Sequence, residues 1–407
     1  MRRPLPFHYG WIIVATGALI LFACLGLARY AYTMLLPGMS AGLGLSYDRM
    51  GFISTGNFAG YFLSVLLAPR LLRYFSPRQT IVAGLLLISS CMLALSRSHD
   101  YALIIVLYTL IGIGGGFANI PLMTIVPRWF RSKERGKAIG LVIGGNGAAI
   151  VFAGILVPVL NRVGGGEGWR SGWLVLGLLS LMVTGVAGLL LRNSPGEMGL
   201  EPVGVAVPVV AADLLPREHP GDRRVLLYLG FLYLIFGATF MVFGTFIVTT
   251  MVKEFGLSEA RAGLYLSWVG LFSTVSGVAF GALSDCIGRK WGLALVFAVQ
   301  SVAYGVVGFT TAGEGLRVAI ILYGLALFAI PTIMTAAVAD YFGLARAAST
   351  FATVTLFFAI GQTLGPGSAG LIARASGTFT TAYGLAAFLT VSAAVGACFL
   401  PPPPRQS

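Results

Sequence analysis

Apolar residues gather in twelve nearly continuous stretches of about twenty residues, and polar residues are concentrated in the shorter segments between them. A helix needs about 20 apolar residues to cross a lipid bilayer, whereas a barrel strand needs only about 10. The pattern therefore predicts an all-α membrane protein with twelve transmembrane helices. They begin near Gly10, Arg49, Gln79, Tyr101, Gly136, Ser171, Arg224, Glu259, Lys290, Gly315, Arg346 and Thr378.

The longest polar interruption, about residues 192–223, falls between the sixth and seventh stretches. We therefore expect an N-terminal six-helix half over residues 1–191, a linker over 192–223 and a C-terminal six-helix half over 224–407. The linker is interpreted as a flexible connector, and a short helix at the membrane surface is the alternative.

One stretch of the sequence occurs twice, 212 positions apart. Residues 44–80 align without a gap to residues 256–292, and each copy is a polar lead-in, an apolar run and a basic turn. Internal duplication of hydrophobic segments is typical of transporters, so the two halves are expected to be pseudo-symmetric. Matching pairs are Gly44 with Gly256, Leu45 with Leu257, Ser46 with Ser258, Gly51 with Gly263, Ser64 with Ser276, Leu71 with Leu283 and Arg78 with Lys290.

Composition and charge agree with a membrane protein. Hydrophobic residues make up 57% of the chain and charged residues 10%, whereas roughly 25% of residues are charged in a soluble domain. If the N-terminus is cytoplasmic, 18 Lys and Arg residues lie on that side and 8 outside. This excess follows the positive-inside rule, so both termini are expected in the cytoplasm. It also accounts for the net charge of +13 without nucleic acid as a partner.

The remaining features narrow the class of protein. The first apolar run is too long for a cleaved signal peptide, and the absence of any Asn-X-Ser/Thr sequon fits a multi-pass protein of a bacterial plasma (inner) membrane. No phosphate loop, nucleophile elbow or His/Cys metal spacing occurs. We therefore expect a monomer in the lipid bilayer that is not an enzyme and has no catalytic residues, metal site or cofactor.

The second copy of the repeat ends in a basic turn with a distinctive spacing, Gly281-Ala-Leu-Ser-Asp285-Cys-Ile-Gly288-Arg289-Lys290. Gly288 permits a sharp turn, and Arg289 can neutralise Asp285. The turn resembles the signature loop of the major facilitator superfamily, which implies that fold and a role in gating for these residues. The first copy departs from the pattern, since it has Pro69, Arg73, Ser76 and Pro77 at the Gly, Asp, Gly and first basic positions.

Other motifs resemble particular branches of that superfamily. Arg128-Trp129-Phe130, Gly168-Trp169-Arg170 and the segment from Asn193 to Gly204 are similar to the monocarboxylate and oxalate/formate transporters. The opening helix, with Gly26-Leu-Ala-Arg29-Tyr-Ala-Tyr32-Thr33, instead resembles the YbfB-type facilitators.

Arg29 is the leading candidate for a binding residue. It lies inside the first apolar stretch, which holds no acidic residue, and a charge there costs several kcal/mol unless it meets a partner or water. In the monocarboxylate transporters, a first-helix lysine at the same distance from a Gly-Trp start acts on substrate and proton, and aligning Gly10-Trp11 places Arg29 on that lysine. The alternative is that Arg29 reaches the outer interface or holds a neighbouring helix. Helical spacing places Phe22, Leu25, Gly26, Tyr32 and Thr33 on its face.

The other charges of that family's site are missing. Its eighth-helix Asp and Arg would fall at Ser273 and Gly277, and no Asp or Glu lies in the middle of any span. An uncompensated Arg29 favours an anionic substrate whose carboxylate pairs with it. Proton symport then rests on the resemblance alone, since uniport or anion exchange would need no acidic residue.

Several uncharged polar residues also lie within the spans. Asn119 and Tyr323 are further candidates for substrate binding, because the fourth and tenth helices line the cavity in this fold. For the rest, hydrogen bonding between packed helices is the simpler explanation; they are Asn57, Asn146, Gln300, Gln362, Tyr265 and Trp268.

The sequence thus predicts a secondary transporter that moves a small organic anion, a monocarboxylate, by alternating access, with protons as a second partner in a symport mechanism. Substrate binding is expected at Arg29, Tyr32, Thr33, Asn119 and Tyr323. One alternative is an exporter of amphipathic compounds. The other is a transporter-like sensor that binds ligand without moving it.

Overall fold

The computed structural model describes residues 7–204, 222–309 and 313–402 of the chain. Contacts divide the chain into two compact units, Met1–Gly44 with Gly56–Pro208 and Leu45–Thr55 with Val209–Ser407. Residues 205–221 of the expected linker, and the chain ends at 1–6 and 403–407, lie outside the described residues.

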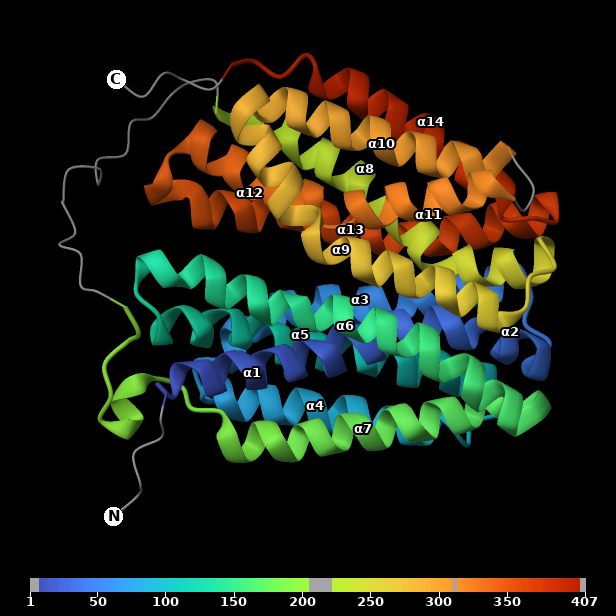
Figure 1. Ribbon diagram of the computed structural model, residues 1–407, viewed down its shortest axis with the longest axis horizontal. Helices are drawn as coiled ribbons and strands as arrows, with labels where there is room; N and C mark the ends of the chain where they lie inside the picture. Colours follow the sequence, from blue (N-terminus) through green and yellow to red (C-terminus); the bar gives the residue numbers. More distant parts are fainter. Residues whose placement is uncertain (1–6, 205–221, 310–312, 403–407) are drawn as a thin grey trace. The chain divides into compact units, whose positions relative to one another are not determined.

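Each unit is a bundle of long helices (Figure 1). The first contains α1 (Gly10–Leu21), the π-helix η1 (Phe22–Tyr30), α2 (Ala31–Leu43), α3 (Tyr47–Leu71), α4 (Pro77–Leu95), α5 (Tyr101–Trp129), α6 (Ser132–Gly164) and α7 (Gly168–Leu190), with short 3-10 turns at Gly165–Glu167 and Pro195–Met198. The second contains α8 (Asp222–Thr249), the π-helix η5 (Thr250–Glu254), α9 (Glu259–Ile287), α10 (Arg289–Phe309), α11 (Glu314–Ala326), α12 (Ala329–Phe342), α13 (Leu344–Ser376) and α14 (Thr380–Ala397). The first turns of α3 belong to the second unit by their contacts.

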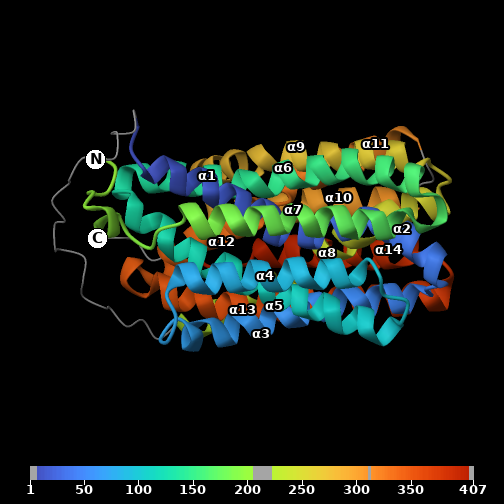
Figure 2. The ribbon, with the colours of Figure 1, turned by 90° about the horizontal axis from the view of Figure 1, so that it is seen from below.

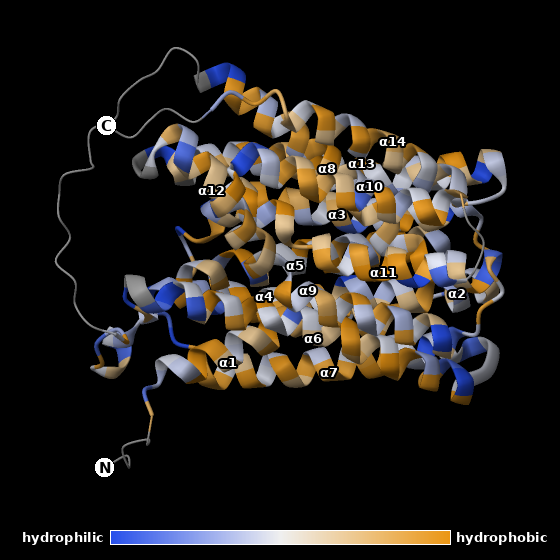
Figure 3. Ribbon diagram, turned by 45° about the horizontal axis from the view of Figure 1, so that its top comes forward, coloured by the Kyte–Doolittle hydropathy of each residue, from blue (hydrophilic) through white to orange (hydrophobic). Residues whose placement is uncertain are grey.

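The helices have the length and surface of membrane spans. Eleven helical stretches among the described residues are long and apolar enough to cross a bilayer, and one of them, Glu134–Leu190, has 57 residues and contains both α6 and α7. The twelve predicted crossings are therefore all present. Hydrophilic residues gather toward the helix ends (Figure 3). Large apolar side chains remain exposed along the helices, such as Val106, Met182 and Val278 at 54%, 69% and 78%, as expected for surfaces that face lipid.

Helix ends carry the local signals expected from their sequences. Ser76 begins α4 with a capping box, in which its hydroxyl accepts from the backbone of Gln79 and the Gln79 side chain accepts from its backbone N–H. Gly44 ends α2 at φ +62°, and its repeat equivalent Gly256 has φ +66°. A side chain is strained in this left-handed conformation, so glycine occupies both positions.

The two units use equivalent helix pairs. In the first, α1 packs on α6 and α4 packs on α5 and α7, and in the second, α8 packs on α13 and α10 packs on α11 and α14. Figure 2 shows α4 and α5 side by side. The duplication in the sequence is therefore a duplication of packing, which makes every local difference between the units informative.

Candidate functional site

Arg29 lies in a part of the first helix whose winding differs from that of an α-helix. From Phe22 to Tyr30 it is a π-helix, and the backbone N–H of Ala31 donates to the carbonyl of Gly26, five residues earlier. A Cβ on Gly26 would lie 2.0 Å from the Cβ of Ala149 on α6, so the glycine allows η1 to lie directly against that helix. π-helical turns are rare and often occur at functional sites.

Arg29 extends from η1 toward α3, where two aromatic rings receive it. The guanidinium carbon Cζ lies 4.8 Å from the centroid of the Phe58 ring and 4.7 Å from that of the Tyr61 ring. Its Nε atom is buried and has no hydrogen-bond partner among the described residues. Aromatic faces attract a cation but accept few of its hydrogen bonds, so the rings do not satisfy the N–H groups of the guanidinium.

Tyr61 links Arg29 to the second candidate, Asn119. The side-chain amide Nδ2 of Asn119 on α5 donates to the Tyr61 hydroxyl at 2.9 Å. Arg29, Tyr61 and Asn119 are each partly exposed. The structure therefore joins two of the predicted binding residues through a tyrosine that sequence reasoning missed. A signal existed, because Phe58 and Tyr61 lie in the duplicated stretch at positions where the second copy has Gly270 and Ser273.

Two other predicted residues, Tyr32 and Thr33, are 1% and 2% exposed. The Tyr32 ring lies 4.6 Å from that of Tyr108, which in turn lies 5.9 Å from Trp173. Tyr32 is thus part of an aromatic cluster between α2, α5 and α7. Because the π-helix changes the number of residues per turn, ordinary helical spacing does not determine which residues share a face with Arg29.

Tyr323 belongs to the second unit and is 1% exposed. Its hydroxyl donates to the carbonyl of Phe240 at 2.8 Å, and its ring stacks on Phe243 at 4.2 Å. Met241, which aligns with Arg29 across the repeat, is also buried. The second unit therefore has packed side chains where the first has a guanidinium.

The other polar span residues lie mainly in helix contacts. Asn57 donates to the carbonyl of Tyr108 at 3.0 Å, and Tyr265 accepts from Arg317 at 3.4 Å and lies 5.4 Å from Trp268. Gln300 is fully buried, and both of its amide atoms lack a hydrogen-bond partner among the described residues.

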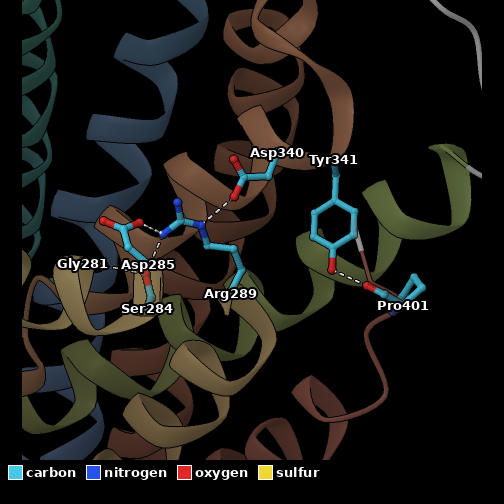
Figure 4. A network of polar contacts seen from close by, with 7 residues as sticks. All are labelled: Gly281, Ser284, Asp285, Arg289, Asp340, Tyr341 and Pro401. Atoms are coloured by element: carbon cyan, nitrogen blue, oxygen red, sulfur yellow. Dashed lines mark hydrogen bonds and ion pairs between the residues drawn. The ribbon is translucent and has the colours of Figure 1, made fainter. Parts of the chain in front are cut away.

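The basic turn of the second copy is built around Arg289, at the start of α10 (Figure 4). Its Nε donates to Asp340 at 2.7 Å, and its Nη1 donates to Ser284 at 2.8 Å and to Asp285. The hydroxyl of Ser284 donates to the carbonyl of Gly281 at 2.8 Å. Arg289 therefore ties the end of α9 to the end of α12, and Asp340 is a partner that the sequence did not suggest.

The rest of this turn has different contacts. Gly288 has φ +89° and separates α9 from α10. The ammonium of Lys290 lies 5.2 Å from the Trp291 ring rather than in the ion pairs. A pocket of about 300 Å³ borders the turn and is lined by Ser284, Asp285, Ile287, Gly288, Arg289, Lys290, Trp291, Asp340, Tyr341, Pro401 and Pro402.

The corresponding turn of the first copy is held by the end of α7 and the segment after it. The guanidinium of Arg78 donates to the carbonyl of Gly188, and its backbone N–H donates to Asn193 at 2.9 Å. Asn193 in turn donates to Glu197 at 2.7 Å. Arg73, at the position of the missing aspartate, is exposed and forms no ion pair with the residues described.

Residues 192–204, here called the strap, continue across the ends of α1 and α5. Val203 donates from its backbone to Trp129 at 2.8 Å and accepts from Arg131 at 2.9 Å, and Arg131 forms an ion pair with Glu201 at 2.8 Å. His8 shares a hydrogen bond with the Glu201 carbonyl at 2.9 Å. The strap thus connects the ends of α1, α4, α5 and α6 in the first unit.

Comparison with protein families finds a match over residues 21–397 to the family described as uncharacterised MFS-type transporter YbfB, where MFS stands for major facilitator superfamily. Monocarboxylate transporter 3 of Rattus norvegicus is 25% identical, with 95% of this chain and 79% of that protein covered. The hexuronate transporter of Bacillus subtilis is 21% identical, with 91% and 89% covered.

Two solved structures have a similar fold. A bacterial homologue of the human lysosomal transporter Spinster, inward-facing and unoccupied, has a TM-score of 0.74 at 16% identity, with 98% of this chain and 96% of that chain covered. A mutant of the nucleoside transporter NupG has a TM-score of 0.76 at 11% identity, with 95% and 99% covered. At these identities the likeness concerns the fold alone.

Proposed function

The chain belongs to the YbfB-type family of major facilitator superfamily transporters, and on that premise we propose that it moves a small organic anion, a monocarboxylate, by alternating access. The chain is a multi-pass membrane transporter and not an enzyme. What remains to be argued is which compound it carries and how.

The observation that carries the proposal is the surroundings of Arg29. Its guanidinium lies between Phe58 and Tyr61 and forms no ion pair with a carboxylate of the described residues. An uncompensated charge within the membrane is costly, and an anionic substrate supplies the missing partner. Since the rings cover the faces of the guanidinium, a carboxylate would approach its edge, where paired N–H groups match two carboxylate oxygens.

The relatives support the same class of substrate. The names monocarboxylate transporter and hexuronate transporter both denote carboxylates. The first unit offers a fixed cation for such a group, whereas Met241 in the second unit is uncharged. We therefore place the substrate carboxylate on Arg29, with Asn119 as a second contact. Tyr32 and Thr33 are buried in the first unit and Tyr323 in the second, so we propose that each supports the packing of its own unit.

We also propose proton symport. No Asp or Glu of the described residues contacts Arg29, so the proton would travel with the substrate carboxylate or through water rather than on an acidic side chain. We further propose that both termini lie in the cytoplasm and that the protein resides in the plasma membrane; the excess of Lys and Arg on the proposed cytoplasmic side, 18 against 8, supports this orientation.

Uptake by purified protein in liposomes tests the proposal. Labelled carboxylates would be supplied with and without an inward proton gradient to wild type, Arg29→Met and the control Arg73→Met. Arg29→Met copies the second unit's residue, and Arg73 is exposed. We expect Arg29→Met to lower carboxylate uptake at least tenfold and Arg73→Met to leave it unchanged, with both variants monodisperse in detergent.

Each alternative gives a different result. Unchanged uptake by Arg29→Met would remove Arg29 from the site, and flux independent of substrate charge would indicate an exporter of amphipathic compounds. Binding of carboxylate without any flux would indicate a sensor. Uptake that ignores the pH gradient would rule out proton symport while leaving the anion site in place.

A further inference from the structure

Tyr61 contacts both of the groups expected to bind substrate, and its hydrogen bond with Asn119 limits where its hydroxyl hydrogen can point. The Asn119 Nδ2 group is a donor only, so the Tyr61 oxygen accepts this bond. The Tyr61 hydroxyl hydrogen must therefore point elsewhere, and it has no acceptor among the described residues. Tyr61 is partly exposed as a residue, and a hydroxyl hydrogen without an acceptor is costly unless a ligand or water accepts it.

The position of the tyrosine limits where that ligand lies. The Tyr61 ring centroid is 4.7 Å from the guanidinium carbon of Arg29. On this placement, a small molecule whose carboxylate pairs with Arg29 would have its neighbouring atoms within reach of the Tyr61 side chain. Arg29 and Tyr61 both present N–H or O–H donors, and neither presents an acceptor to the ligand. Such a site matches a compound with two separate acceptor groups.

Resting on the proposed function, we propose that Tyr61 is a specificity-determining residue of the site. Its hydroxyl donates to a second oxygen of the substrate, so the protein selects carboxylates that carry a further hydroxyl, carbonyl or carboxylate oxygen over plain aliphatic acids. Besides its own contact with the substrate, Asn119 positions Tyr61, because by donating to the Tyr61 oxygen it directs the hydroxyl hydrogen toward the substrate. A site built to make a hydrogen bond discriminates strongly against an analogue that lacks the partner atom.

The test compares uptake of butanoate and 2-hydroxybutanoate, which have the same carbon chain and carboxylate. We expect wild type to favour the hydroxy acid at least tenfold in kcat/KM. Tyr61→Phe keeps the ring beside Arg29 and removes only the hydroxyl, so its uptake of 2-hydroxybutanoate should fall at least tenfold further than its uptake of butanoate, and the preference should be lost. A structural role for Tyr61 would instead lower uptake of both acids equally.

Substitutions of Asn119 test the direction of the hydrogen bond. An ionised aspartate can only accept, so Asn119→Asp would turn the Tyr61 hydroxyl away from the substrate and should remove the preference as Tyr61→Phe does. In the double variant, Tyr61→Phe with Asn119→Asp, the preference should be no lower than in either single variant. Retention of the preference in Asn119→Asp would overturn the positioning role.

The outcomes separate this inference from the proposed function. If wild type carries neither acid nor any other carboxylate, the proposed function fails. If wild type carries both acids at similar rates, or if Tyr61→Phe retains a tenfold preference, only the role of Tyr61 fails. Binding of both acids to each purified variant, followed by isothermal titration calorimetry, gives the same ratio without flux and identifies a variant that has failed to fold.

Discussion

The hydroxyl of Ser276 accepts a hydrogen bond from the backbone N–H of Phe328 at 3.1 Å, at the point where α11 has ended and α12 begins. The repeat offset of 212 residues relates Ser276 to Ser64 and Phe328 to Gly116. Ser64 lies against Gly116 so closely that a Cβ there would be 1.5 Å from its hydroxyl oxygen. The two serines, which are equivalent in the repeat, thus contact equivalent positions of the neighbouring helix. That helix is interrupted between α11 and α12 in the second unit, whereas α5 is continuous in the first.

We expect Ser276→Ala to destabilise the second unit, because the interrupted helix leaves the Phe328 N–H in need of a partner. Loss of one such bond costs about 1 kcal/mol, which a thermal unfolding assay in detergent would detect as a lower Tm. Ser301→Ala is the control, since Ser301 is exposed and bonds within its own helix to Ala298. If Ser276→Ala and the control have the same Tm, water serves as the partner of the Phe328 N–H.

Close contact between α3 and α5 predicts a strong effect of a single methyl group. A Cβ on Gly112 would lie 1.9 Å from the backbone oxygen of Asn57, whereas a Cβ on Gly144 would meet nothing within 4 Å. Gly112→Ala should therefore abolish the monodisperse peak in fluorescence-detected size-exclusion chromatography. Gly144→Ala should be tolerated or stabilise the helix by up to about 1 kcal/mol. A normal profile for Gly112→Ala would mean that α3 and α5 can separate at low cost.

The ion pairs of Arg289 should contribute modestly to stability. Asp340 and Asp285 have side chains that are 37% and 62% exposed, and exposed pairs contribute about 0.2–1 kcal/mol. Asp340→Asn should therefore lower Tm slightly, and the double substitution of Asp340 and Asp285 by Asn should lower it more, because Arg289 is 16% exposed and would then have no carboxylate. Measurements at low and high salt would test this account, since wild type should lose more stability in salt than the double variant.

Attachment of the strap depends on backbone hydrogen bonds, so proline should release it. Val203→Pro removes the N–H that donates to Trp129, and we expect residues 192–204 to become sensitive to limited proteolysis. Glu201→Ala removes only the ion pair with Arg131, in which Glu201 is 86% exposed, and should leave the cleavage rate near that of wild type. If protease cleaves the strap of Val203→Pro no faster than that of wild type, other contacts attach the strap.

The sequence predicted the architecture because membrane spans follow from local composition. Each apolar stretch had the length of a crossing, and the repeat predicted equivalent halves, so neither inference needed contacts between distant residues. The strap could not be predicted in the same way. Its bond between Val203 and Trp129 joins residues 74 positions apart, and nothing in either residue indicates the partner.

For the candidate site, charge and helical spacing pointed to different residues, and both remain predictions. Arg29 was identified because a cation in an apolar stretch is costly, and its location within a span agrees with that reasoning. Tyr61 was missed because tyrosine is common in membrane helices, and its contact with Asn119 spans 58 residues. Asp340 was missed for a similar reason, since it lies 51 residues from Arg289.

The π-helix at Phe22–Tyr30 also affects how this protein can be compared with other transporters. A π turn closes over one residue more than an α turn. In a relative whose first helix is α-helical throughout, the residue aligned with Arg29 by counting from Gly10 would point about 100° away around the helix axis. Deleting one residue upstream would likewise replace Arg29 with a neighbour in the site. A single insertion or deletion upstream, with the sequence around Arg29 unchanged, would therefore turn this charge toward another face of the helix.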